Sequence, residues 1–88
     1  MPAARLGHVL IVDGEAVLAS VVASYLDRAG FYTTVTGGGL EAVDLARRLD
    51  PTVVILDLSL PGLAGVEVCR RIRTFSGPET FALGVGEC

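Results

Sequence analysis

Two aspartates stand at the ends of short apolar runs, a position where a carboxylate can be a catalytic or ligand-binding group. Asp57 follows the run Val53–Leu56, and Asp13 follows the run His8–Val12. An unbroken apolar run of this length is typical of a parallel strand that is buried on both faces. The carboxyl ends of such strands form the ligand crevices of open α/β sheets. Each aspartate is therefore either a reactive group or a cap for the loop that follows it.

The chemistry of this pair depends on the strands being neighbours, as the first and third strands of a doubly wound sheet are. Two carboxylates in one crevice repel each other unless a cation or a proton lies between them. Oxygen ligands suit Mg²⁺, which binds one or two carboxylates and completes its shell with water and phosphate. A carboxylate beside such an ion can attack phosphorus and form an aspartyl phosphate. The alternative is that Asp13 and Asp57 only end strands and cap loops, and their expected adjacency favours the shared site.

Alternating strand and helix patterns position the two aspartates. Strands are predicted at 8–12, 31–36 and 53–57, with a weak one at 81–83, and helices at 15–29, 40–49 and about 64–73. Gly30 ends the first helix, and the Asp50-Pro51 pair ends the second, because the residue before proline is pushed out of the helical region. Strands that alternate with helices imply right-handed crossovers and a parallel sheet. The predicted fold class is therefore α/β with a doubly wound parallel sheet.

The helical spacing of apolar residues also predicts which side chains face the sheet. In the first helix these are Val17, Leu18, Val21, Val22, Tyr25 and Leu26. In the second they are Leu40, Val43 and either Leu45 or Ala46, and in the third they are Val66, Cys69 and Ile72.

Composition limits the functions open to the chain. Its 88 residues, 51% of them hydrophobic, suit one small domain, and its net charge is −3 with arginine as the only basic residue type besides one histidine. The cluster Arg70, Arg71 and Arg73 is expected to be a solvated helix face, so no direct nucleic-acid partner is predicted. No apolar stretch approaches the length of a membrane span, and Met1–Gly7 lacks the apolar core of a signal peptide. We therefore expect a cytoplasmic protein without a membrane partner.

Four segments together resemble a known family. They read HVLIVDGE at 8–15, LEAV at 40–43, PTVVILDLSLPG at 51–62 and GVEVCRRIR at 65–73. The chain resembles the receiver domain of two-component response regulators, in the style of those with a winged-helix output domain. The resemblance implies a flavodoxin-like sheet that here lacks its last strand and last two helices. It also implies a phosphorelay signalling role with a histidine kinase as partner, and no enzyme activity is expected.

The resemblance implies roles for particular residues. Asp57 matches the phosphoacceptor, Asp13 matches the first member of an acidic pair, and the backbone carbonyl of Ser59 matches a Mg²⁺ ligand. Gly14 stands where the family has a second carboxylate, so Mg²⁺ binding is expected to be weak. The hydroxyl residue of the fourth strand falls on Gly84, and no residue matches the family's lysine. We therefore expect impaired phosphorylation. The alternative is a phosphorylation-incompetent pseudo-receiver that acts as an interaction or dimerisation module, or a vestigial fragment.

The end of the chain departs from this pattern. We expect residues 1–7 to be a tail, 8–76 a truncated receiver domain and 77–88 a divergent strand and tail, which suggests an altered or truncated reading frame after about Ser76. Without the last strand and helices, a sheet edge and apolar surface would be uncovered, and such surfaces favour association. A homo-oligomer formed through the exposed sheet edge is therefore predicted.

Overall fold

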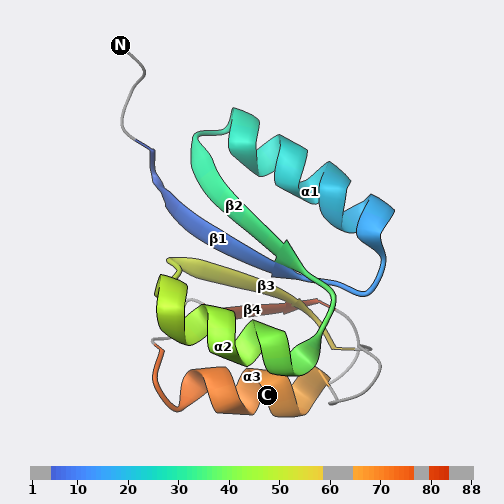
Figure 1. Cartoon of the computed structure of the whole chain (residues 1–88). Coiled ribbons are helices and arrows are strands. Elements are labelled where there is room, and N and C mark those ends of the chain that lie inside the picture. Colours follow the sequence, from blue (N-terminus) through green and yellow to red (C-terminus); the bar gives the residue numbers. More distant parts are fainter. Residues whose placement is uncertain (1–4, 59–64, 77–79, 84–88) are drawn as a thin grey trace.

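Four parallel strands form a sheet with helices on both faces (Figure 1). The computed structural model describes residues 5–58, 65–76 and 80–83. In chain order the elements are β1 (Gly7–Val12), α1 (Ala16–Arg28), β2 (Phe31–Thr36), α2 (Gly39–Leu49), β3 (Val53–Asp57), α3 (Gly65–Arg73) and β4 (Thr80–Leu83). The strand order across the sheet is β2-β1-β3-β4. The predicted α/β class, the alternation of elements and the parallel sheet are confirmed.

The helices cover the two faces of the sheet unequally. α1 lies on one face, and α2 and α3 lie side by side on the other (Figure 1). The larger core lies between the sheet and α2 with α3, and its buried members are Leu10, Val12, Ala42, Ala46, Val54, Leu56, Leu58, Val68, Cys69 and Ile72. The core under α1 has three buried members, Val9, Ile11 and Ala19. On that face Val53 and Ile55 are half-buried, because α1 lies mainly over β1 and β2.

The predicted inward face of α1 was wrong in part. Val22 and Leu26 pack against the sheet, but the most buried residue of the helix is Ala19. The exposed side chains are Val17, Leu18, Val21 and Tyr25, with exposed fractions of 82%, 50%, 48% and 70%. The helix is apolar around most of its circumference, so spacing alone did not select one stripe. The small Ala19 lets the helix approach the sheet closely, and the bulkier residues are left outside.

The prediction for α2 was also wrong in part, because small residues again let the helix approach the sheet closely. Leu40 is 67% exposed, whereas Ala42 and Ala46 are buried and Val43 and Leu45 are half-buried. Small residues again form the contact with the sheet. In α3 the prediction holds for Cys69 and Ile72, which are buried, and in part for Val66, which is half-buried.

The helix ends follow the predicted stops. Gly30 has a φ of 105° directly after the Ala29 cap of α1, a conformation that favours glycine. α2 ends at Leu49, and Asp50 before Pro51 adopts the left-handed conformation with a φ of 45°.

The start of α3 packs against the backbone that follows β3. A Cβ atom added at Gly65 would lie 2.3 Å from the Cα atom of Leu58 and 2.6 Å from its carbonyl carbon and oxygen. Backbone atoms cannot yield as the end of a flexible side chain can. This glycine therefore sets how closely α3 approaches the end of the strand that carries Asp57.

We expect Gly65→Ala to lower the free energy of unfolding by about 1–3 kcal/mol, because the added methyl group overpacks a buried contact. Gly37→Ala is the matched control, since a Cβ there would meet its nearest neighbour at 3.6 Å. Urea denaturation followed by circular dichroism measures both. Equal stability of the two variants would contradict the close packing of α3 on Leu58.

Candidate functional site

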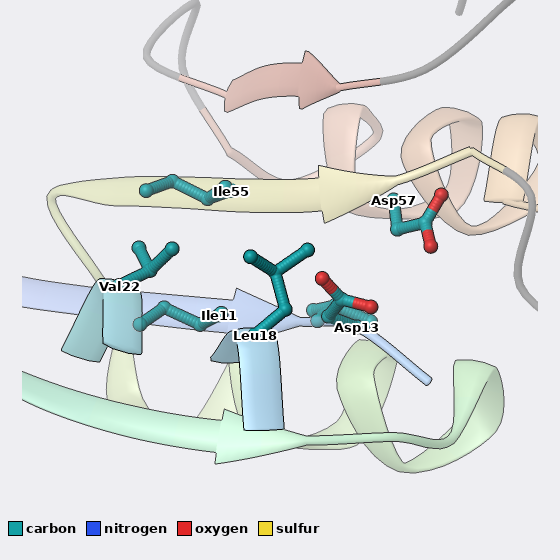
Figure 2. Close-up of a pocket in the computed structure, with 7 residues that line it drawn as sticks. Ile11, Asp13, Leu18, Val22, Ile55 and Asp57 are labelled. Atoms are coloured by element: carbon teal, nitrogen blue, oxygen red, sulfur yellow. The ribbon is translucent and has the colours of Figure 1, made fainter. Parts of the chain in front are cut away.

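The pairing of β1 with β3 brings Asp13 level with Asp57. The register runs from Val9 opposite Val53 to Val12 opposite Leu56. Asp13 directly follows Val12, and Asp57 directly follows Leu56. Side chains alternate between the faces of a sheet, so both carboxylates lie on the face that α1 covers. Figure 2 shows the two carboxylates turned toward each other beyond the carboxyl ends of the strands. The expected convergence of the two acids is thus present, and their chemical roles stay predictions.

The two aspartates line a pocket of about 260 Å³. Its walls come from β1, β3 and the first turns of α1, and the lining residues are Ile11, Val12, Asp13, Leu18, Val22, Ile55 and Asp57. The carboxylates occupy one end of this pocket, and apolar side chains form the rest (Figure 2). The pocket therefore offers negative charge beside an apolar wall.

Asp13 also caps the start of α1. Its Oδ1 atom accepts a hydrogen bond from the backbone N–H of Glu15 at 2.9 Å, and Glu15, the N-cap residue, makes no side-chain cap itself. The backbone N–H of Asp13 donates to the carbonyl oxygen of Thr36 at 3.0 Å, which extends the contact between β1 and β2. The Asp13 carboxylate therefore has both roles. Its hydrogen bond to the Glu15 N–H fixes its orientation, and it still faces Asp57 across the pocket.

Thr36 is a supporting residue that sequence reasoning missed. It is 4% exposed, its hydroxyl donates to the carboxylate of Glu41, and the backbone N–H of Gly38 donates to the same hydroxyl at 3.3 Å. These bonds join the end of β2 to the first turn of α2. The signal in the sequence was a threonine before a glycine-rich loop with an acid in the helix that follows, a pattern related to helix capping.

The donor set for a metal ion is small. Among the residues that the structure describes, no three His, Cys, Asp or Glu side chains are grouped so that they could hold a metal ion. Two facing carboxylates fit Mg²⁺ as an ion that keeps most of its water or takes phosphate oxygens. Gly14 is exposed and adds no carboxylate, and Glu15 does not line the pocket. Ser59, the third predicted ligand, lies outside the described residues.

Comparison with known proteins identifies the family. The response regulator receiver domain matches residues 9–85 of this chain. The chain belongs to the response regulator receiver family. The resemblance inferred from the sequence is confirmed, and the match extends past Ser76 into β4. Receiver domains generally bind Mg²⁺ and are generally phosphorylated by histidine kinases.

Relatives and solved structures agree with this assignment. The DNA-binding response regulator MtrA of Mycobacterium tuberculosis is 45% identical over 70 residues, which cover 80% of this chain and 31% of MtrA. The BeF3-activated N-terminal receiver domain of Klebsiella pneumoniae RstA has a TM-score of 0.80 at 25% identity. The aligned region covers 85% of this chain and 64% of the RstA chain. For the response regulator domain of Thermotoga maritima CheB the TM-score is 0.76 at 30% identity, and the aligned region covers 89% of this chain and 58% of the CheB chain.

These comparisons also fix the extent of the match. The chain spans about a third of the length of MtrA and about three fifths of the two solved chains. The flavodoxin-like receiver fold is confirmed, and the described sheet is an incomplete version of it. In the described parts of the chain, no helix combines the length and the apolar character that crossing a bilayer requires.

We expect two substitutions of Asp13 to distinguish the effect of its hydrogen bond to the Glu15 N–H from the effect of its negative charge. Asp13→Ala removes the acceptor for the Glu15 N–H and should lower the free energy of unfolding by about 0.5–1.5 kcal/mol, the net contribution of one hydrogen bond. Asp13→Asn keeps an oxygen acceptor and removes the repulsion from Asp57, so its stability should equal or exceed that of the wild type. Urea denaturation at neutral pH measures both variants. A loss as large for the Asn variant as for the Ala variant would contradict the capping role.

Proposed function

We propose that this chain is a phospho-accepting receiver module in which Asp57 takes a phosphoryl group from a histidine kinase. The carboxylate oxygen would form the new bond to phosphorus, and the bond between phosphorus and the imidazole of the donor would break. The observation that carries this proposal is the carboxylate of Asp57, which faces Asp13 in a pocket at the carboxyl edge of a receiver fold. In this role the chain accepts a signal and is not itself an enzyme.

The same proposal includes weak Mg²⁺ binding. Asp13 and Asp57 would hold the ion, with the Ser59 carbonyl as the third protein ligand expected from the family. Bound Mg²⁺ would neutralise negative charge on the carboxylates and on the incoming phosphoryl group. Gly14 supplies no ligand, which supports an affinity below that of receivers with the full acidic pair.

The surface beside the pocket supports a protein partner. A kinase that phosphorylates Asp57 must contact the residues around the pocket, and Leu18 both lines the pocket and is half-exposed. Val17, Val21 and Tyr25 continue this exposed apolar surface along α1. Contiguous exposed apolar side chains are typical of interaction sites.

Two departures from the family favour a second candidate, a pseudo-receiver that keeps the scaffold and has lost the switch. Gly14 stands at the place of the second carboxylate, and Gly84 falls at the place of the hydroxyl residue that ends the fourth strand. Each missing group of this kind costs a factor of about 10²–10³ in rate, by analogy with removed oxyanion donors. We therefore propose slow phosphorylation, and in its absence a module for protein interaction or dimerisation.

Incubation with acetyl phosphate and Mg²⁺ tests the proposal without a kinase. We expect a phosphoryl adduct on the intact protein by mass spectrometry, formed about 10²-fold or more slowly than on a receiver with the full acidic pair. The adduct should be absent from Asp57→Asn. Asp44→Asn is the matched control, because Asp44 is exposed and pairs with Arg48 on α2. An unmodified wild-type protein after long incubation would favour the pseudo-receiver.

We further propose a cytoplasmic homo-oligomer that makes no direct contact with nucleic acid. Response regulators are typically cytoplasmic. β4 and β2 are the two edge strands of the described sheet, and β4 is the edge at which the family has its last strand. Edge strands pair readily with other chains, and on β2 the side chains of Tyr32 and Val35 are exposed. Arg70 and Arg71 lie in ion pairs with Glu67, which supports a solvated face for this basic stretch.

Sedimentation velocity across a hundredfold range of concentration tests the oligomer. We expect a dimer or larger species. Thr80→Lys on β4 or Val35→Lys on β2, whichever edge pairs, should shift it toward the monomer because a charge on an edge strand opposes pairing. Leu40→Lys is the control, because Leu40 is an exposed residue of α2 and belongs to neither edge strand, and it should leave the distribution unchanged. A single monomeric species at every concentration would refute the oligomer.

A further inference from the structure

α1 is exposed on the side that faces away from the sheet (Figure 1). We call this side the outer face of α1, and its members are Val17, Leu18, Val21, Ser24, Tyr25 and Arg28. The residues at positions 17, 21, 24 and 28 are separated by four, three and four residues, which is the spacing of a seam between two packed helices. Contiguous exposed apolar side chains are also typical of an interaction surface. The outer face of α1 therefore has the pattern of a surface that packs against another helix.

This outer face has a hollow in one half and a projection in the other. The hollow has a volume of about 220 Å³ and is lined by Val21, Ser24, Tyr25 and Arg28. These residues stand at positions i, i+3, i+4 and i+7, which on a helix form a hole for one side chain of a facing helix. Val17, in the first turn of α1, is 82% exposed and projects from the other half. A surface with both features can pack against a copy of itself.

We propose that the outer faces of two copies of this chain pack against each other, with their α1 helices antiparallel. In this arrangement the first half of each helix lies against the second half of the other, so Val17 of each copy enters the hollow of the other. Val21 lies in the middle of the contact, where a two-fold axis passes. A two-fold contact uses the same surface on both copies and closes at two, so the assembly is a dimer.

The charges at the ends of α1 support this arrangement. Glu15 lies directly before the helix and Arg28 ends it, and both are exposed. Among the residues that the structure describes, neither of these side chains has an ion-pair partner. Antiparallel helices bring Glu15 of one copy to the end where Arg28 of the other lies, which gives two pairs of opposite charge. Parallel helices would place like charges together, which is unfavourable across a contact.

The proposed contact is small. α1 has 13 residues and is therefore about 20 Å long. One pair of helices of this length buries less than the roughly 1,000 Å² that stable interfaces need, so the dimer is weak and reversible. The contact involves neither β2 nor β4, so it is separate from association through the sheet edges.

Pairing has a consequence for signalling. The outer face of α1 is also the surface that a kinase would contact on its way to Asp57. A second copy on this face therefore excludes the kinase, and the kinase excludes the second copy. This consequence rests on the proposed phosphoacceptor function, whereas the pairing itself does not.

Sedimentation equilibrium tests the pairing on the whole chain with Val35→Lys and Thr80→Lys, because these charges oppose association through either edge strand. We expect a monomer–dimer equilibrium between about 20 μM and 1 mM, as for a small and transient interface. Val21→Lys, added to this chain, should weaken dimerisation by about tenfold or more, because two lysines would meet near the two-fold axis. Leu40→Lys is the control and should change nothing, since Leu40 is exposed on α2, on the opposite face of the sheet.

Exchange of the two end charges tests the antiparallel order. In the same background, Glu15→Arg or Arg28→Glu alone should weaken the dimer by about threefold to tenfold at low ionic strength, because two attractive pairs become repulsive. The chain with both substitutions should regain the original affinity, since opposite charges meet again. Circular dichroism checks that each variant is folded.

Three results would overturn the inference. They are a monomer at every concentration, which would leave the outer face to a kinase, a dimer that Val21→Lys does not weaken, and a double charge exchange that does not restore the affinity. Amide shifts on dilution of the wild-type chain decide the matter even where a variant folds poorly. We expect these shifts to map to α1, and shifts confined to β2 and β4 would contradict the pairing.

The pairing and the proposed function can fail separately. A wild-type chain that pairs through α1 and takes no phosphoryl group from acetyl phosphate would refute the phosphoacceptor function and sustain the pairing. A chain that is phosphorylated at Asp57, and whose α1 amide shifts do not depend on concentration, would do the reverse.

Discussion

The parallel register of β1 on β3 is the constraint on which the rest of this molecule depends. Pairing from Val9 with Val53 to Val12 with Leu56 sets the two aspartates side by side. A slip of one residue would turn one carboxylate to the opposite face of the sheet. Helices cover both faces of these strands, so such a slip would also exchange the residues of the two cores. Hydrophobic burial therefore holds the register, and the register creates the site.

Hydrogen bonds then fix the edge of the site where β1 and β2 end. Asp13 accepts the N–H of Glu15 and donates its own N–H to Thr36, and Thr36 bonds to Glu41 and Gly38 in turn. The start of α1, the end of β2 and the start of α2 are thus joined around one carboxylate. These bonds hold the carboxylate of Asp13 in place at the end of the pocket that it shares with Asp57.

Unequal coverage of the sheet gives the site its mixed character. The face under α2 and α3 carries the larger core, while the face under α1 leaves Val53 and Ile55 half-buried. The pocket lies on this thinner side, where the apolar wall of β1, β3 and α1 meets the two carboxylates. The same thin layer leaves Leu18 both at the wall of the pocket and half-exposed. Charge, apolar surface and access therefore coincide at one end of the sheet.

Sequence by itself determined the elements, their order and the placement of Asp13 and Asp57 at strand ends, because apolar runs, helical spacing and the Gly30 and Pro51 stops are local signals. The rule for doubly wound sheets also predicted that these strands are neighbours. Tertiary structure alone decided which stripe of α1 is buried, since that helix is apolar on nearly every side and close approach selects Ala19. It also decided the link from Thr36 to Glu41 and the apolar wall beside the acids. Those features depend on the distance between packed elements, which no local pattern encodes.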